Sequence, residues 1–145
     1  MGALTGVRVL DLTNVLSGPF CTLHLALLGA EVIKVENPKG GDLARVLGNV
    51  PKFNKQLMGT SFLAQNVNKK SLTLNLKAEE GRAIFKKLVA KADVVVENFR
   101  PDVMTRLGLG YPTLAEINPK LIYCAVSGCG HTGLPNHAVL PGPDG

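Results

Sequence analysis

The stretch that decides the fold runs from Val7 to Glu36 and has the sequence VRVLDLTNVLSGPFCTLHLALLGAEVIKVE. Its hydrophobic pattern predicts a strand over 7–12, a helix over 20–28 and a second strand over 31–36. A strand–helix–strand unit of this kind places the helix N-terminus at one edge of a parallel sheet. Because the first N–H groups of a helix attract anions, phosphate-bearing cofactors bind at that edge. The opening of the chain therefore favours a cofactor-binding α/β domain.

The helix in this stretch has clear start and stop signals. We expect Ser17 or Gly18 to cap it and Gly29 to end it. Its side chains are apolar nearly all round, which predicts burial on more than one side. The apolar residues are Phe20, Leu23, Leu25, Leu27 and Leu28.

Strands and helices alternate along most of the remaining chain. Period-two alternation predicts a strand over 72–76, near a sheet edge, and a helix follows from Glu79. The pattern then predicts a strand over 94–97, short helices ending at Gly108 and Ile117, and a last strand over 121–127. Residues 43–66 have weak periodicity, so we expect an irregular segment with one helical turn around 59–63. The alternation predicts an α/β fold with a doubly wound, mostly parallel sheet of about five strands.

Composition limits the class of protein. The 145 residues are 46% hydrophobic, enough for one packed domain, and we place that domain at 1–133 with a Gly/Pro-rich tail at 134–145. No apolar run approaches the roughly 20 residues that span a bilayer. No targeting segment is evident either, so we expect a cytoplasmic protein without a membrane partner. The net charge of +5 suits a polyphosphate ligand. With no Trp and only two Tyr, stacking surfaces for nucleic acid are scarce.

The cysteines and histidines predict neither a disulfide framework nor a metal site. The three cysteines form no CxxC pair, and the three histidines lack metal-ligand spacing with them or with one another. We therefore expect no bound metal.

A dinucleotide-binding loop is one interpretation of residues 13–19. Such a loop needs GxGxxG so that the backbone can approach a pyrophosphate. This loop has only Gly18, followed by Pro19, which has no N–H to donate. Glu36 does lie near the usual distance for a ribose-binding acid. An NAD-type oxidoreductase is thus one alternative, beside a helix start with no ligand at all.

Polar residues at two other strand ends are also candidates. Asn98, Phe99 and Arg100 follow an apolar strand, and together they could hydrogen-bond, stack on and neutralise an adenine or a phosphate. Arg106 lies about one and a half helical turns further on. The plainer alternative is a solvated arginine and a core phenylalanine. A second polar group flanks the strand near residue 72, and it is either a solvated face or a phosphate clamp: Asn66, Asn68, Lys69, Lys70, Asn75 and Lys77.

Four segments together resemble the N-terminal part of the family III CoA-transferases, the CaiB/BaiF type. They are VRVLDLTNVLSGPFCTLHLALLGAEVIKVENPKGGD, NKKSLTLNLKAEEGR, ADVVVENFRPDVMTRLGLGY and INPKLIYCAVSGCGHTG. The family includes formyl-CoA transferase, succinyl-CoA:glutarate CoA-transferase and the related α-methylacyl-CoA racemase. The resemblance runs from about Leu4 to Gly133, and it does not indicate the acyl group.

The resemblance implies a function and a set of contacts. Family members move CoA from an acyl-CoA to a carboxylic acid through a nucleophilic aspartate. They form interlocked homodimers and hold CoA as a substrate in the N-terminal α/β lobe. The positions of this chain that match the family's CoA contacts are Leu16, Ser17, Leu74, Asn75, Leu76, Lys77, Asn98, Phe99, Arg100 and Arg106.

Departures from the family pattern shape the remaining expectations. Asn37 stands where the family usually has arginine, which predicts weaker CoA binding by roughly 1–3 kcal/mol. The nucleophilic aspartate is expected beyond Gly145, and Asp144 is a poor substitute. We therefore expect a CoA-binding lobe that is inactive alone. A second hypothesis is a non-catalytic module that pairs with a full-length transferase subunit.

Overall fold

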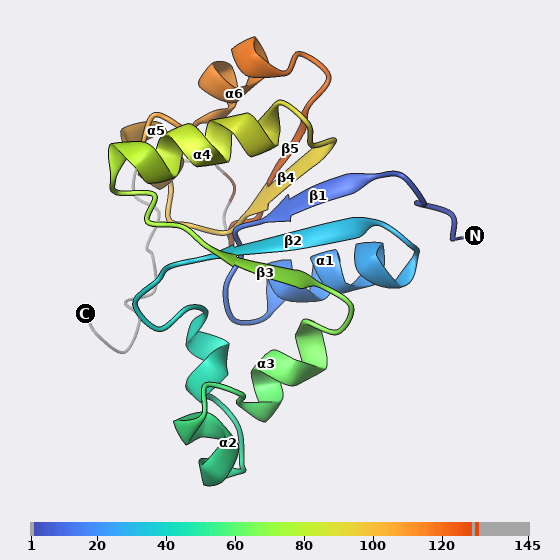
Figure 1. The fold of residues 1–145 in the computed structure, drawn as a ribbon, viewed down its shortest axis with the longest axis vertical. Coiled ribbons are helices and arrows are strands. Elements are labelled where there is room, and N and C mark those ends of the chain that lie inside the picture. The colour runs from blue at the N-terminus through green and yellow to red at the C-terminus, as the bar shows by residue number, and fades with distance from the viewer. Residues whose placement is uncertain (1, 129, 131–145) are drawn as a thin grey trace.

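The computed structural model describes residues 2–128 and Gly130. Within this part of the chain, five parallel strands form one sheet in the order β3-β2-β1-β4-β5 (Figure 1). The predicted doubly wound parallel sheet is confirmed. The strands are β1 (Arg8–Asp11), β2 (Glu31–Glu36), β3 (Lys70–Thr73), β4 (Val94–Glu97) and β5 (Ile122–Ala125).

The sheet has helices on both faces (Figure 1). One face packs against α1 (Ser17–Leu27) through a cluster that includes Val9, Ala26 and Val96. The opposite face holds the larger cluster, to which three helices contribute: α4 (Glu79–Val89), α5 (Val103–Arg106) and α6 (Tyr111–Ile117). Neighbouring residues of each central strand point to opposite faces, so Val9 and Leu10 belong to different clusters. Both faces of the central strands are thus apolar, as in other parallel sheets.

The segment between β2 and β3 is more regular than predicted. It contains a 3-10 helix, η1 (Leu43–Val46), and two short helices, α2 (Pro51–Lys55) and α3 (Thr60–Gln65). These elements have four to six residues each, so helical periodicity has no room to develop in the sequence. A Cβ at Gly59 would lie 2.4 Å from the Leu47 carbonyl oxygen. Glycine is therefore required where α3 packs against η1.

The first helix departs from its prediction in two ways. It begins at Ser17, three residues early, with Leu16 at the N-cap, so neither Ser17 nor Gly18 caps it through a side chain. The prediction that this helix is buried on more than one side is also wrong for this chain, because Phe20 and Leu27 are 52% and 61% exposed. The predicted stop at Gly29 is confirmed, since this residue has φ +102°.

The other elements lie close to their predicted positions. Strands β2 and β4 have the predicted bounds, and β3 begins two residues and ends three residues earlier than predicted, at the predicted sheet edge. The helix predicted from Glu79 is α4, in which Phe85 and Val89 are buried and Ile84 is exposed. No helix in the described part of the chain is long and apolar enough to cross a membrane. The predicted boundary at 133, the 134–145 tail and Asp144 lie outside the described residues.

Candidate functional site

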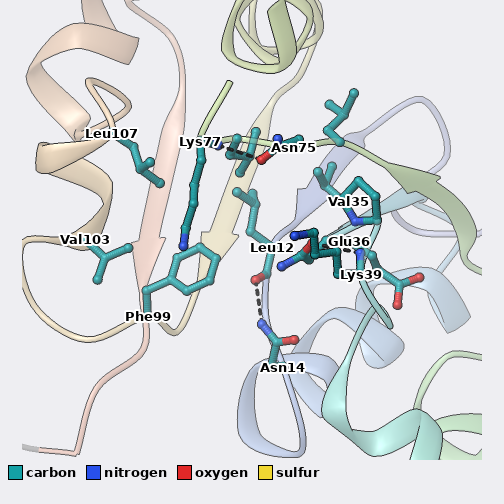
Figure 2. Close-up of a pocket in the computed structure, with 14 residues that line it drawn as sticks. Leu12, Asn14, Val35, Glu36, Lys39, Asn75, Lys77, Phe99, Val103 and Leu107 are labelled. Carbon is teal, nitrogen blue, oxygen red and sulfur yellow. Dashed lines mark hydrogen bonds between the residues drawn. The ribbon is translucent and has the colours of Figure 1, made fainter. Parts of the chain in front are cut away.

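The carboxyl ends of β1, β2, β3 and β4 surround a cavity of about 390 Å³ (Figure 2). Apolar side chains from these strand ends and from α5 form most of its wall, and polar side chains contribute the rest. Its lining residues include Leu12, Asn14, Val35, Glu36, Asn37, Lys39, Leu74, Asn75, Leu76, Lys77, Phe99, Val103 and Leu107. We call it the strand-end cavity.

The chemistry of the strand-end cavity suits a flat ring joined to an anionic group. Phe99 and the leucines offer an apolar wall against which an aromatic ring can stack. Lys39 and Lys77 are exposed and bring two cations to the same cavity. Asn75 Oδ1 accepts a hydrogen bond from the Lys77 N–H at 3.1 Å, which shapes the chain just after β3. Small-molecule sites commonly combine apolar walls with a few polar groups in this way.

A second cavity, of about 530 Å³, adjoins the first. It lies between the loop after β1 and the loop after β4, and Phe99 lines both cavities. We call it the loop cavity; its lining residues are Asn14, Val15, Leu16, Ser17, Asn98, Phe99 and Arg100. The N-terminus of α1 reaches it at Ser17, and no side chain caps that helix end. A helix N-terminus next to Arg100 gives this cavity a positive character.

Asn98 ties the two loops together. Its Oδ1 accepts a hydrogen bond from the Asn14 N–H at 2.8 Å, and its Nδ2 donates to the Asn14 carbonyl oxygen at 2.9 Å. These loops follow β1 and β4, the strands at which the order along the sheet reverses. Ligands of open α/β sheets bind at that switch point. The side chain predicted to contact a ligand therefore also sets the shape of the site.

The structure brings most of the predicted contact residues together. Residues 74–77 line the strand-end cavity, and Leu16, Ser17, Asn98 and Arg100 line the loop cavity. Phe99 lies between the two. Arg106, the remaining predicted residue, is exposed near the end of α5 and lines neither cavity.

Glu36 is unavailable as a ribose-binding acid. Its Oε1 and Oε2 accept hydrogen bonds from Arg45 at 2.7 and 2.6 Å, and Asp42 N–H and Ser71 Oγ donate to the same carboxylate. Burial alone would raise the pKa of Glu36. The hydrogen bonds from Arg45, Asp42 and Ser71, together with the Arg45 charge, outweigh burial and lower the pKa to about 2. With both oxygens engaged inside the protein, this geometry argues against an NAD site.

Beneath the loop cavity lies a buried polar cluster that sequence reasoning missed. The Asp11 carboxylate accepts hydrogen bonds from Thr13, Thr22 Oγ1 and Lys69 Nζ. Burial would raise the pKa of Asp11, but the charges of Lys34 and Lys69, together with the hydrogen bonds from Thr13 and Thr22, outweigh burial and lower it. The expectation that Lys69 faces solvent or a phosphate is wrong, because its side chain is 1% exposed.

Lys34 is a second buried cation in this cluster. Its Nζ donates to the Thr13 carbonyl oxygen at 2.7 Å and lies 2.9 Å from Asp42 Oδ2. The burial of Lys34 could have been predicted from one feature of the sequence. This lysine lies between apolar neighbours in a strand of the type that is buried on both faces. Among the described residues, no three His, Cys, Asp or Glu side chains are grouped to hold a metal ion.

Comparison with known proteins gives a consistent result. The family model for CoA-transferase family III matches residues 4–145. Succinyl-CoA:glutarate CoA-transferase of Mus musculus is 49% identical over 137 residues, covering 94% of this chain and 31% of the mouse protein. Acetyl-CoA:oxalate CoA-transferase of Acetobacter aceti is 52% identical over 132 residues, covering 91% of this chain and 33% of that protein. The chain thus spans about a third of the length of these relatives.

Solved structures share the fold. The crystal structure of Rv3272 from Mycobacterium tuberculosis superposes with a TM-score of 0.83 at 42% identity, over 92% of this chain and 36% of that one. A CaiB/BaiF family protein from Brucella suis gives a TM-score of 0.82 at 41% identity, over 92% of this chain and 35% of that one.

Proposed function

This chain belongs to CoA-transferase family III, and from that membership we propose that it is the CoA-binding lobe of an enzyme that transfers CoA from an acyl-CoA to a carboxylic acid. The observation that carries the proposal is the pair of adjoining cavities at the carboxyl edge of the sheet. Nine of the ten residues matched to the family's CoA contacts line them. The relatives named above act on succinyl-CoA and glutarate or on acetyl-CoA and oxalate, so the acyl group and acceptor acid stay unassigned.

The adenosine end of CoA fits the strand-end cavity best. An adenine ring can pack between the Phe99 side chain and residues 74–77, where the cavity wall is apolar. The phosphate groups then lie within reach of the exposed Lys39 and Lys77. Arg45, a third cation near this cavity, is already paired with Glu36. Lys39 and Lys77 therefore supply the positive charge that faces the phosphates. An arginine at position 37 would add to that charge.

The pantetheine arm and thioester would then pass Phe99 into the loop cavity. There the uncapped N-terminus of α1 and the Arg100 guanidinium would stabilise negative charge that develops on the thioester oxygen. Transfer begins when a carboxylate attacks the thioester carbonyl and the CoA thiolate leaves. Among the described carboxylates near the cavities, Glu36, Asp42 and Glu97 all accept internal hydrogen bonds. We assign none of them as the nucleophile, and the aspartate implied by the family resemblance lies outside the described residues.

Assembly and location form a further part of the proposal. Phe20, Leu27 and Leu28 expose apolar surface on or at the end of α1, which favours association with another chain. A cytoplasmic homodimer remains our expectation. The same exposed residues favour the second hypothesis, a non-catalytic module on a longer transferase subunit. Sedimentation of the purified chain separates these cases, because a self-associating chain gives a mass that rises with concentration.

Calorimetric titration with CoA tests the proposal. We expect binding in the micromolar range, weakened about tenfold by Arg100→Ala because a charge-assisted contact is lost. Lys87→Ala removes an exposed cation on α4 and serves as the matched control, with unchanged affinity. NAD should not bind. Absence of CoA binding, or equal affinity in the Arg100 and Lys87 variants, would contradict the proposed site.

A further inference from the structure

The loop between β1 and α1 contains a strained residue. Val15 has φ +69°, in the left-handed region. A β-branched side chain adopts that conformation only when its surroundings impose it. Val15 lines the loop cavity, as do Leu16 and Ser17 directly after it. The strain therefore lies in the segment that would face the bound ligand.

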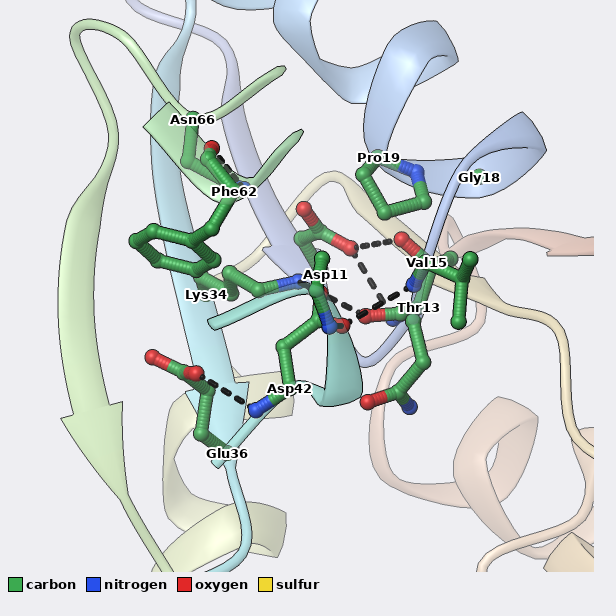
Figure 3. Close-up of polar contacts among 12 residues, drawn as sticks. Asp11, Thr13, Val15, Gly18, Pro19, Lys34, Glu36, Asp42, Phe62 and Asn66 are labelled. Atoms are coloured by element: carbon green, nitrogen blue, oxygen red, sulfur yellow. Dashed lines mark hydrogen bonds and ion pairs between the residues drawn. The ribbon is translucent and has the colours of Figure 1, made fainter. Parts of the chain in front are cut away.

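Two buried, oppositely charged side chains hold this loop on either side of Asn14 (Figure 3). Lys34 Nζ donates to the carbonyl oxygen of Thr13 at 2.7 Å. Asp42 Oδ1 accepts a hydrogen bond from the Val15 N–H at 3.0 Å. The side chains of Lys34 and Asp42 are 1% and 0% exposed and form an ion pair with each other at 2.9 Å. Neither side chain lines either cavity.

Asp42 is itself held in place by Glu36 and by the start of η1. Its N–H donates to Glu36 Oε1 at 3.0 Å, and its Oδ1 also accepts a hydrogen bond from the Ala44 N–H at 2.9 Å at the start of η1. Lys69 fixes the first turn of α1, directly after this loop, by donating to the Pro19 carbonyl oxygen at 2.9 Å. The loop thus has little freedom to relax. Asp42 holds the N–H of the strained residue, and the side-chain amide of Gln65 donates to the Val15 carbonyl oxygen at 2.7 Å.

From this arrangement we propose that Lys34 and Asp42 are positioning residues for CoA, which keep the 13–17 loop in the strained conformation that lines the loop cavity. The inference rests on the proposed function. Neither residue touches the ligand or the reacting atoms. Their contribution is to hold Val15, Leu16 and Ser17 in place before CoA arrives, so that binding does not have to order the loop.

Rescue by glycine distinguishes positioning from a general loss of structure. Asp42→Ala should weaken CoA binding at least tenfold, because Val15 is no longer held in the left-handed region. Glycine adopts that region without penalty, so Val15→Gly combined with Asp42→Ala should recover most of the lost affinity. Glu31→Gln is the control, since Glu31 pairs with Arg8 and Lys70 at the opposite edge of the sheet, and its affinity should be unchanged. A double variant no better than Asp42→Ala would overturn the proposal.

Hydrogen exchange followed by NMR tests the same inference without CoA. In Asp42→Ala the Val15 amide should lose protection at least tenfold while the β1 amides keep theirs. If the Val15 amide keeps its full protection in a folded Asp42→Ala variant, the proposal is wrong. If Asp42→Ala does not fold, Asp42→Asn keeps an oxygen acceptor for Val15 and removes the charge facing Lys34. In this variant the Val15 amide should exchange faster than in the wild type. An unchanged exchange rate would contradict the proposed role of the Lys34–Asp42 ion pair. If the wild type fails to bind CoA, the proposed function fails, and the exchange rates still decide the inference.

Discussion

The ion pair between Glu36 and Arg45 gives the sharpest energetic prediction. The perturbation is Glu36→Gln, which keeps the shape of the side chain and an oxygen acceptor but removes the charge. In the folded protein the pKa of Glu36 falls from 4.5 to about 2. Each pKa unit corresponds to about 1.4 kcal/mol, so ionised Glu36 stabilises the folded state by about 3 kcal/mol at pH 7. We expect Glu36→Gln to lower the free energy of unfolding by that amount.

The sign of the pH dependence follows from the depressed pKa. The stabilisation is complete above the unfolded pKa of 4.5 and is lost as the pH falls toward the folded pKa of about 2. At pH 3.5 about 1.4 kcal/mol of it is gone. The difference between wild type and variant should therefore shrink from about 3 kcal/mol at pH 7 to about 2 kcal/mol at pH 3.5.

Urea unfolding at 25 °C and both pH values measures this difference. Glu116→Gln, an exposed carboxylate on α6, is the matched control and should change stability by less than about 0.5 kcal/mol. A difference for Glu36→Gln below about 1 kcal/mol at pH 7, or one that is the same at both pH values, would refute the assignment of Glu36 as a buried structural anion.

Three further predictions concern the site. Asn98→Ala removes two hydrogen bonds to Asn14, so urea unfolding should show a loss of about 1–3 kcal/mol; a neutral change would mean that the loops hold without this tie. Asn37→Arg adds a guanidinium to the strand-end cavity and should tighten CoA binding about fivefold by calorimetry, whereas weaker binding would place the phosphates elsewhere. Lys69→Met leaves the buried Asp11 without its direct partner and should cost about 3–5 kcal/mol in the same unfolding assay, and stability within 1 kcal/mol of wild type would contradict the pairing.

Local sequence signals were sufficient for the sheet. Strand β2 is bounded by Gly29 before it and by Asn37 and Pro38 after it, and β4 is a short run of valines ending in Glu97. Both have the bounds that these signals predict. In the segment 43–66, the predicted helical turn around 59–63 coincides with the start of α3, whereas η1 and α2 were missed because they are too short to develop a period.

The residues that line the site could be predicted from the sequence, but the contacts that hold those residues in place could not. Polar residues after parallel strands converge at one edge, so Asn75, Lys77 and residues 98–100 could be placed at that edge in advance. Leu74 and Leu76 were added only by the family resemblance. The partners of Asn98 and Lys34 could not, because Asn14 lies 84 residues from Asn98 and the role of Lys34 depends on Asp42 in the next segment. Exposure of Phe20 and Leu27 is also invisible in a pattern that indicates only apolar character.

An NMR titration of the ¹⁵N-labelled chain with CoA tests the central claim most directly, because it reports both binding and its location. The account predicts saturable shifts concentrated in residues 14–17, 74–77 and 98–100, which line the two adjoining cavities. Saturable shifts confined to α2, α4 or α6, or no shifts at millimolar CoA, would contradict a CoA site at the carboxyl edge of this sheet.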